Sequence, residues 1–431
     1  MEKLLKKLKN YCDQAEIYVT HEQSECTHII DKKIKKTDLN ILSGTAIRFI
    51  RNGKIGFTYT RNILDEEKLI KQLLISAENG VKAEFDFPST VIDKAIDSYD
   101  TEIENTDKNA IFDDMNEKYE MIDKQIDAQI HGYMATGVSE TRILNTSGTD
   151  LYQKSSEYYN AIMIGYTDRN SSLDSYIYTK KYQTHNKDDI QKKINLFKSG
   201  MDMKTPRTGR YPVIFSPLCI SELLNRFIIA AHPASFYSKT TPLMNAMNSR
   251  IFSEKLTIFQ QPKNDSNPGA RLFDDEGVEC RDMNFVEDGI FKGFYTNLNF
   301  AGKLQTEKTG NGFRSYGIEH PPVPTLSHLA VKTGEKSLEA MIESIEDGLI
   351  VFNLLGGHSG NVLAGEFSVG VGTGFYIKNG KVIASVKDCM LAGNIYQVFD
   401  QIREIEDRGL QVGSSILPSI LFDNISVSGI D

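Results

Sequence analysis

Histidine, glutamate and cysteine are the residues from which a zinc-dependent hydrolase is built, so the eight histidines are the first candidates for chemistry. A helical zinc-protease site places two histidines about one turn apart and a glutamate next to the first, where its carboxylate can polarise a zinc-bound water. His21-Glu22 is the only His-Glu dipeptide in the chain, and the positions one turn later hold Glu25 and Cys26. We therefore interpret His21 as a surface residue.

Other kinds of catalytic site find equally little support. The sequence has no Gly-x-Ser-x-Gly motif, and Cys219 lies in an apolar segment, which is typical of an inert core thiol. The run DDEG (274–277) could hold an acid–base pair, but we favour a solvated turn closed by its glycine. The segments LLGGHSGN (354–361) and GVGTG (370–374) lack the strand, lysine and helix that surround a phosphate-binding loop.

The composition limits the class of protein. The chain has 431 residues, with 49 basic and 58 acidic side chains and a formal charge of −9. Because an acidic surface repels phosphate groups, we expect no nucleic-acid partner. The five cysteines are scattered and include no Cys-x-x-Cys pair, which favours a reducing compartment. Since neither a signal peptide nor an apolar run that could cross a bilayer is present, we predict a cytoplasmic protein with no membrane partner.

Strand-like and helix-like segments alternate with tight turns along the whole chain. Asn-Gly or Asp-Gly pairs at 52–53, 288–289 and 379–380 lie between alternating apolar and polar runs. Such pairs indicate β-hairpins, because both residues of the turn must tolerate positive φ. Hairpins connect neighbouring antiparallel strands, so the sequence predicts an α+β fold with largely antiparallel sheets and flanking helices.

Helical periodicity identifies the segments that should cover these sheets. Apolar residues recur every three or four positions in an N-terminal helix and in helices expected at 65–79, 109–130 and 188–199. The N-terminal helix has lysines between its leucines, and we place it on the body of the protein rather than on a membrane surface. A Pro/Gly/polar linker follows the last of these helices. We therefore expect an N-terminal α+β domain at 1–205 and a β-rich C-terminal domain at 206–431.

The second half carries a series of distinctive segments that cover nearly all of residues 206–429. In order they are TGRYPVIFSP, RLFDDEGVECRDMNFVEDG, EDGLIVFNLLGGHSGNVLAGEFSVGVGTG, KDCMLAGNIYQVFDQI and GSSILPSILFDNISVSG. This series resembles the C-terminal domain of the TldD/PmbA family, whose members have been called modulators of DNA gyrase. The first half is more loosely similar to the same family, through GTAIRFIRNGKIGFTYT (44–60) and the turn NTSG (145–148).

The resemblance implies a two-subunit peptidase. TldD-type chains hold zinc with a His-Glu-x-x-x-His helix and a later cysteine, whereas PmbA-type (TldE-type) chains lack these ligands and pair with a TldD-type chain. In this sequence the three helix positions are Ser221, Glu222 and Arg226, and GSS (413–415) stands where the cysteine is expected. A guanidinium cannot be deprotonated to bind a metal, and a hydroxyl is a poor zinc ligand. We therefore expect no catalytic residue, no metal and no other cofactor.

These observations predict a PmbA/TldE-like subunit, itself non-catalytic, that pairs with a TldD-type zinc metalloprotease and helps bind its peptide substrate. Glycines in LAGEFSVGVGTG leave a strand open to pairing with an extended peptide or a partner. The groove we expect there includes His358, Gly365, Glu366, Ser368 and Gly370. A curved sheet that needs glycine at its bends explains the same pattern equally well.

Two other functions stay open at this point. The chain could be a metal-dependent peptidase in its own right, with ligands drawn from His232, His320 and His358 together with Glu222 or Glu366. It could also be a homodimeric binding or regulatory protein that acts on a topoisomerase. The acidic charge balance argues against direct contact with DNA in that case.

Overall fold

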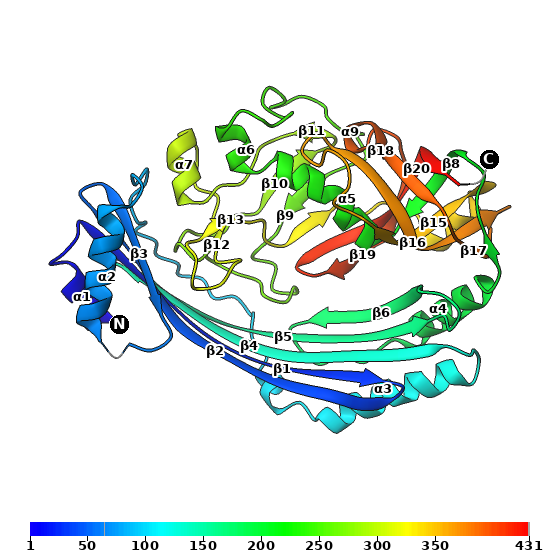
Figure 1. Cartoon of the computed structure of the whole chain (residues 1–431), viewed down its shortest axis with the longest axis horizontal. Coiled ribbons are helices and arrows are strands. Elements are labelled where there is room, and N and C mark those ends of the chain that lie inside the picture. Colours follow the sequence, from blue (N-terminus) through cyan, green and yellow to red (C-terminus); the bar gives the residue numbers. More distant parts are fainter. Residues whose placement is uncertain (64, 430–431) are drawn as a thin grey trace.

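The computed structural model describes residues 1–63 and 65–429, which form two large β-sheets with helices on their faces (Figure 1). Neighbouring strands are antiparallel throughout the first sheet and in most of the second. Helices lie outside the sheets rather than alternating with their strands along the chain. The predicted α+β fold class is therefore confirmed.

The first sheet is made of long strands from the N-terminal half. They are β1 (Gln14–Ile30), β2 (Lys33–Arg51), β3 (Lys54–Thr60), β4 (Gln129–Asn145), β5 (Asp150–Gly165) and β6 (Ser172–Thr179). Their spatial order is β3-β2-β1-β4-β5-β6. The sheet is curved, and the C-terminal half of the chain lies over its concave face (Figure 1). Because side chains alternate between the two faces of a strand, every second residue of β1, β4 and β5 points toward the C-terminal half.

The helices of the first half are α1 (Glu2–Leu8), α2 (Glu66–Glu78), the short 3-10 helix η1 (Thr101–Asn105), α3 (Lys108–Asp123) and α4 (Lys187–Ser199). Helix α3 covers the convex face, where Met115 and Tyr119 are buried with Tyr158 and Ile130. The helix predicted at 109–130 is therefore too long. The chain leaves the helix at Asp123 and starts β4 six residues later, so Ile130 enters the same core from a strand.

The second sheet is built from the C-terminal half. Its strands are β7 (Met203–Lys204), β8 (Gly209–Phe215), β9 (Ile258–Gln260), β10 (Met283–Glu287), β11 (Ile290–Phe291), β14 (Leu329–Val331), β15 (Asp347–Leu355), β16 (Glu366–Lys378), β17 (Lys381–Val386), β18 (Met390–Asn394), β19 (Ile402–Val412) and β20 (Ser415–Ser428). The main path is β11-β10-β9-β14-β20-β8-β15-β16-β17-β7, with β18 beside β16 and β20, and β19 beside β20. A separate small hairpin joins β12 (Gly312–Phe313) to β13 (Val323–Pro324).

Helices cover both faces of the second sheet. Those of the C-terminal half are α5 (Pro217–Ala230), α6 (Pro233–Tyr237), α7 (Leu298–Leu304), α8 (Leu338–Glu343) and α9 (Ile395–Val398). Leu223 and Phe227 of α5 share one buried cluster with Ile420 of the sheet. Ile350 lies on the opposite face and packs in the same cluster as Ile194 of α4. Helix α4 thus belongs to the first half in sequence but closes the core of the second.

The predicted turns and most predicted helices are confirmed. Asn-Gly or Asp-Gly pairs join β2 to β3, β10 to β11 and β16 to β17, and all six turn residues have positive φ. The helices expected at 65–79 and 188–199 correspond to α2 and α4 within two residues. Asp65 caps α2 as sequence patterns favour, since its side chain accepts a hydrogen bond from the backbone N–H of Lys68.

The chain passes from the first sheet to the second between Thr179 and Met203, with α4 between them. The domain boundary expected at 205–206 lies just after β7, which already pairs with β17 of the second sheet. That boundary stays a prediction. Within residues 1–63 and 65–429, no helix combines the length and apolarity needed to cross a membrane.

Candidate functional site

Helix α5 carries the three positions at which the zinc-binding motif would lie. Ser216 caps the start of the helix, because its side chain accepts a hydrogen bond from the backbone N–H of Cys219. Ser221 and Glu222 lie half-buried on the flank of the helix. Arg226 follows one turn later, and its side chain points into the protein, where only 1% of the residue is exposed.

Every nitrogen of the Arg226 guanidinium donates a hydrogen bond to a backbone carbonyl group. Nε donates to the carbonyl oxygen of Glu366 at 2.7 Å, and Nη1 donates to that of Glu222 at 3.2 Å. Nη2 donates to the carbonyl oxygens of Gly357 at 2.9 Å and Ser359 at 3.1 Å. The side chain therefore joins α5 to the loop before β16 and to the first residue of that strand. Its place is structural, because its guanidinium ties the half-buried carbonyl groups of this loop to the helix.

Glu222 is the one motif residue that keeps its expected type. Its carboxylate packs against the same loop, so closely that a Cβ at position 357 would fall 2.6 Å from Oε2. A larger residue at that position would have to displace the end of the Glu222 side chain. Partial burial raises the pKa of Glu222, and the nearby charge of Arg226 opposes the rise. Burial in turn lowers the pKa of Arg226 from a value far above neutrality.

These residues do not fit a zinc ion. A bound divalent cation needs lone pairs from several ligands, whereas the second histidine position holds a cationic group with no lone pair to offer. Within the described residues, no cluster of three or more His, Cys, Asp or Glu side chains has the geometry to hold a metal ion. The segment expected in place of the family's cysteine forms the turn between β19 and β20, where Gly413 has a φ of 55°.

The three histidines considered as alternative metal ligands lie apart and have different surroundings. His232 caps α6, with Nδ1 accepting a hydrogen bond from the backbone N–H of Ala234 at 3.2 Å. His320 is exposed beside Tyr316, and His358 is exposed in the loop before β16. Since none of these histidines joins Glu222 or Glu366 in a group of three potential ligands among the described residues, the pool does not form a metal site.

The structure places the predicted peptide groove around the start of β16. Glu366 and Ser368 point outward from this strand, and the loop that precedes it holds the exposed His358. Gly365 has a φ of 86°, which glycine tolerates best. β18 pairs with this part of β16, whereas β15 pairs with it only from Gly370 onward. One side of the strand is therefore without a paired strand for four residues in the described chain, and the groove stays a prediction.

The DDEG run is a turn as predicted, but the prediction that it is solvated is wrong. Asp274, Asp275 and Glu276 are 0%, 4% and 0% exposed. Asp274 accepts hydrogen bonds from the backbone N–H groups of Glu276, Val278 and Gly312. Burial is tolerated because every carboxylate finds donors, which the local sequence alone does not supply.

Glu276 is also the point at which the two halves of the chain meet through buried charges. Arg48 of β2 forms two hydrogen bonds with Glu16 of β1, at 2.9 and 2.8 Å, and a third with Glu276 at 2.7 Å. The other oxygen of Glu276 accepts from the backbone N–H of Leu298 at 2.6 Å. A carboxylate from the C-terminal half thus completes an ion pair of the N-terminal sheet.

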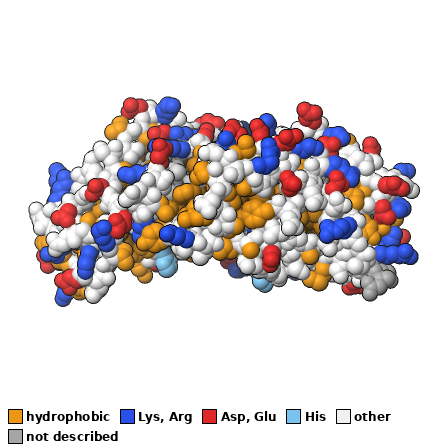
Figure 2. Space-filling view, turned by 90° about the horizontal axis from the view of Figure 1, so that it is seen from above, with side chains coloured by type: hydrophobic (Ala, Val, Ile, Leu, Met, Phe, Trp, Pro, Cys, Tyr) orange, Lys and Arg blue, Asp and Glu red, His pale blue; other side chains and the backbone are white. Residues whose placement is uncertain are grey.

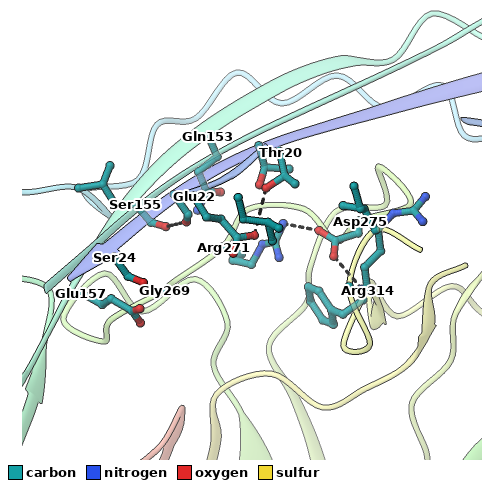
Figure 3. Close-up of a pocket in the computed structure, with 18 of the residues that line it drawn as sticks. Thr20, Glu22, Ser24, Gln153, Ser155, Glu157, Gly269, Arg271, Asp275 and Arg314 are labelled. Carbon is teal, nitrogen blue, oxygen red and sulfur yellow. Dashed lines mark hydrogen bonds and ion pairs between the residues drawn. The ribbon is translucent and has the colours of Figure 1, made fainter. Parts of the chain in front are cut away.

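A cavity of ≈ 520 Å³ lies next to these contacts, between the concave face of the first sheet and loops of the C-terminal half. Figure 3 shows Glu22, Ser24 and Glu157 on its sheet side, Asp275 and Arg314 on its other side, and Arg271 between them. Helix α5 contributes no residue to this lining. The molecule therefore has two separate regions of interest, the altered motif on α5 and the cavity between its halves.

Comparison with known families identifies the chain. A family model described as the PmbA/TldA metallopeptidase C-terminal domain matches residues 208–429, which is more than half of the sequence. A second model, described as PmbA/TldA metallopeptidase domain 1, matches residues 15–81. The chain belongs to the PmbA/TldD family. The predicted family is thus confirmed.

Individual members of the PmbA/TldD family are similar over different lengths. An uncharacterised protein of Methanocaldococcus jannaschii is 22% identical, over 97% of this chain and 98% of its own. A zinc metalloprotease TldD homologue of Saccharolobus solfataricus is 28% identical, over 48% of this chain and 47% of its own. The crystal structure of TldE from Thermococcus kodakarensis has a TM-score of 0.92 and 22% identity, with 100% of both chains covered. At that identity the likeness shows a shared fold.

Sequence reasoning missed the cavity and its charged wall. Arg271 and Asp275 are four residues apart, a spacing at which opposite charges often pair, and they do form an ion pair. This spacing was the feature of the sequence from which an ordered, ion-paired segment could have been predicted. The partner Arg48 lies 228 residues from Glu276. No local pattern in either segment of a PmbA/TldD chain indicates such a contact.

Proposed function

We propose that this chain is a non-catalytic, PmbA/TldE-like subunit that pairs with a TldD-type zinc metallopeptidase in a cytoplasmic complex that degrades or processes peptides. The observation that carries the proposal is the burial of Arg226 at the second metal position of α5. If the side chain at this position could move away, a metal ion could still bind in its place. Arg226 instead has hydrogen bonds to carbonyl groups at all three guanidinium nitrogens.

The remaining motif residue supports the same proposal. Glu222 could polarise a water only if a metal ion were bound beside it, and Ser221 and Arg226 at the other two motif positions offer no suitable ligand. The catalytic zinc would therefore be supplied by the partner. Relatives named TldE and zinc metalloprotease TldD fit a division of labour between two kinds of chain. The free state of all five cysteines is compatible with a reducing compartment.

The pairing is tested by producing this chain together with a relative from the same genome that retains His-Glu-x-x-x-His. We expect the two to elute together in size-exclusion chromatography, with zinc bound at one ion per pair and none bound by this chain alone. Replacing the first motif histidine of the partner should abolish peptidase activity. Separate elution at micromolar concentration would contradict the proposal.

Glu222→Gln in this chain is the sharpest control. If the subunit is non-catalytic, the variant complex should keep its peptidase activity, because Glu222 serves no metal-bound water. A loss of activity with the complex intact would instead mean that this chain contributes a catalytic carboxylate. A stoichiometric transition metal in the isolated chain would likewise favour a peptidase in its own right.

We place the contact with peptide or partner at the start of β16, where Glu366 and Ser368 face outward near His358. Ser368→Arg should raise KM or weaken the complex, because a large side chain would cover the strand. Nucleic acid is not part of the proposal. On the face shown in Figure 2, acidic and basic side chains are interspersed, whereas a nucleic-acid site needs a continuous basic patch. A salt-sensitive shift of DNA by the purified chain would overturn this point.

A further inference from the structure

The cavity between the two halves has the size and composition of a ligand site. Its volume of ≈ 520 Å³ is within the range of small-molecule sites, and it lies between two structural units, where such sites are common. The lining belongs partly to β1, β4 and β5 and partly to the loops around Arg271 and Arg314. Because α5 does not contribute to it, the cavity is independent of the altered zinc motif.

The sheet wall carries hydroxyl groups and two carboxylates without a cationic partner. Ser24, Gly137 and Glu157 lie side by side on β1, β4 and β5, as do Glu22 and two serines in the neighbouring row. Glu22 accepts a hydrogen bond from Thr20, and Glu157 accepts one from a tyrosine hydroxyl. Neither carboxylate forms an ion pair within the described residues. This wall is therefore negatively charged and able to accept further hydrogen bonds.

The opposite wall presents guanidinium groups that the protein leaves partly unused. Arg271 is anchored at one nitrogen, since Nη2 donates to Asp275 at 2.6 Å, and its guanidinium lies 5.1 Å from the centre of the Phe313 ring. Its other nitrogens have no hydrogen bond within the described chain. The Arg314 side chain is only 2% exposed; its Nη2 lies 3.9 Å from Glu16, and neither Nε nor Nη2 has a hydrogen bond in the same part of the chain. The nitrogens of Arg271 that are not used within the protein can donate to a bound anionic group, and such charge-assisted hydrogen bonds would stabilise this wall.

We propose that the cavity binds a short peptide with both termini free, in extended form along the sheet wall. Its carboxylate lies against Arg271, with Arg314 behind it, and its ammonium group lies against Glu22 and Glu157. A ligand with only one kind of charge would find a complementary group on one wall only, whereas a dipolar peptide finds one on each wall. The hydroxyl groups between the charged ends suit the polar backbone of such a peptide. The site belongs to this chain alone and does not require the proposed partner subunit.

The test is calorimetric titration of the isolated full chain with trialanine. We expect saturable binding by the free tripeptide. N-acetyl-trialanine and trialanine amide should each bind at least about tenfold more weakly, because each loses one charge-assisted hydrogen bond. Equal binding of all three peptides, or no binding of trialanine at millimolar concentration, would overturn the proposal.

Variants of the protein test the two ends separately. Glu22→Gln and Glu157→Gln should weaken trialanine about tenfold and leave binding of the acetylated peptide unchanged, because they remove only contacts with the ammonium group. Glu67→Gln, at an exposed position of α2, is the control and should bind like the native chain. Arg271→Gln should remove the advantage of the free carboxylate. If that variant does not fold, the comparison of trialanine with its amide tests the same contact on the native protein.

Discussion

At the scale of single residues, the chemistry of α5 depends on what Arg226 can donate. A metal ligand gives a lone pair, and Arg226 has none, but its planar group offers several donors in one plane. The structure uses these donors to fix the loop before β16, whose carbonyl groups face inward. The position at which the family resemblance leads us to expect a metal ligand thus holds a loop in this chain.

The loop should therefore depend on Arg226. Arg226→Met keeps a long apolar stem but leaves the carbonyl groups of Gly357, Ser359 and Glu366 without their donor. We expect the free energy of unfolding to fall by about 2–4 kcal/mol, since three half-buried acceptors lose their charged donor. Urea unfolding followed by circular dichroism measures the change.

The neighbouring Asn225→Ala is the matched control, because Asn225 is exposed on the same turn of the helix. Its effect should stay within about 0.5 kcal/mol, as is usual for surface positions. Hydrogen exchange gives a second readout, since the amides of residues 357–361 should exchange faster in Arg226→Met alone. A methionine variant as stable as the native chain would show that the guanidinium is not needed to hold the loop.

At the scale of secondary-structure elements, short turns set how the long strands pair. The hairpin between β2 and β3 places Arg48 opposite Phe57 and fixes which residues of β2 face the second half of the chain. A shift of one residue would turn Arg48 to the wrong face of the sheet. The turn residues Asn52 and Gly53 both have positive φ, of 50° and 72°. The charge network therefore depends on a local turn.

Gly53→Ala should destabilise the protein through backbone strain alone. An added Cβ at Gly53 would meet no atom within 4 Å, so steric contact contributes nothing. We expect a loss of about 1 kcal/mol in the free energy of unfolding, because alanine disfavours positive φ. Gly293→Ala is the control, since its Cβ would also be in open space and its φ is not positive. Equal stability of the two variants would contradict this explanation.

At the scale of the whole molecule, buried charges hold the two halves together. Arg48 lies in the N-terminal sheet, and Glu276 lies in the C-terminal half. The two buried carboxylates, Glu16 and Glu276, would be unstable in an apolar core without the guanidinium groups of Arg48 and, at 3.9 Å from Glu16, Arg314. The halves must therefore dock in one arrangement. The same arrangement creates the cavity, because Asp275 and Arg271 adjoin Glu276 in sequence.

The Arg48→Met variant should show how much the buried ion pairs, as distinct from apolar packing, contribute to the free energy of unfolding. The variant leaves Glu276 buried without its cation and Glu16 with only Arg314, 3.9 Å away, and we expect a loss of about 3–5 kcal/mol in the free energy of unfolding. Differential scanning calorimetry measures the effect and shows whether the halves begin to unfold separately.

Arg61→Met is the control for this prediction. Arg61 also bridges the two halves, through Glu319, but its side chain is 54% exposed. Water screens an exposed ion pair, so this variant should unfold almost like the native chain. A similar loss in both variants would mean that bridging the halves, rather than burial of the charges, determines the cost.

The sequence by itself determined the family, the α+β class, the hairpin turns and the absence of metal-binding residue types at Ser221 and Arg226. Each of these depends on local information. Positive φ at an Asn-Gly pair is a property of two residues, and a guanidinium lacks a lone pair in any fold. Helical periodicity likewise located α2 and α4, although it extended α3 too far, because apolar spacing does not show where a helix gives way to a strand.

Only the tertiary structure decided what Arg226 binds, that Asp274, Asp275 and Glu276 are buried, and that a cavity lies beside them. These facts depend on segments that are far apart in the sequence, such as Arg48 and Glu276. A carboxylate in a turn is stable in water or in a core with matching donors, and the sequence pattern is the same in both cases. The donors arrive only when the curved sheet and the C-terminal half dock, so the environment of each charge is set by the fold.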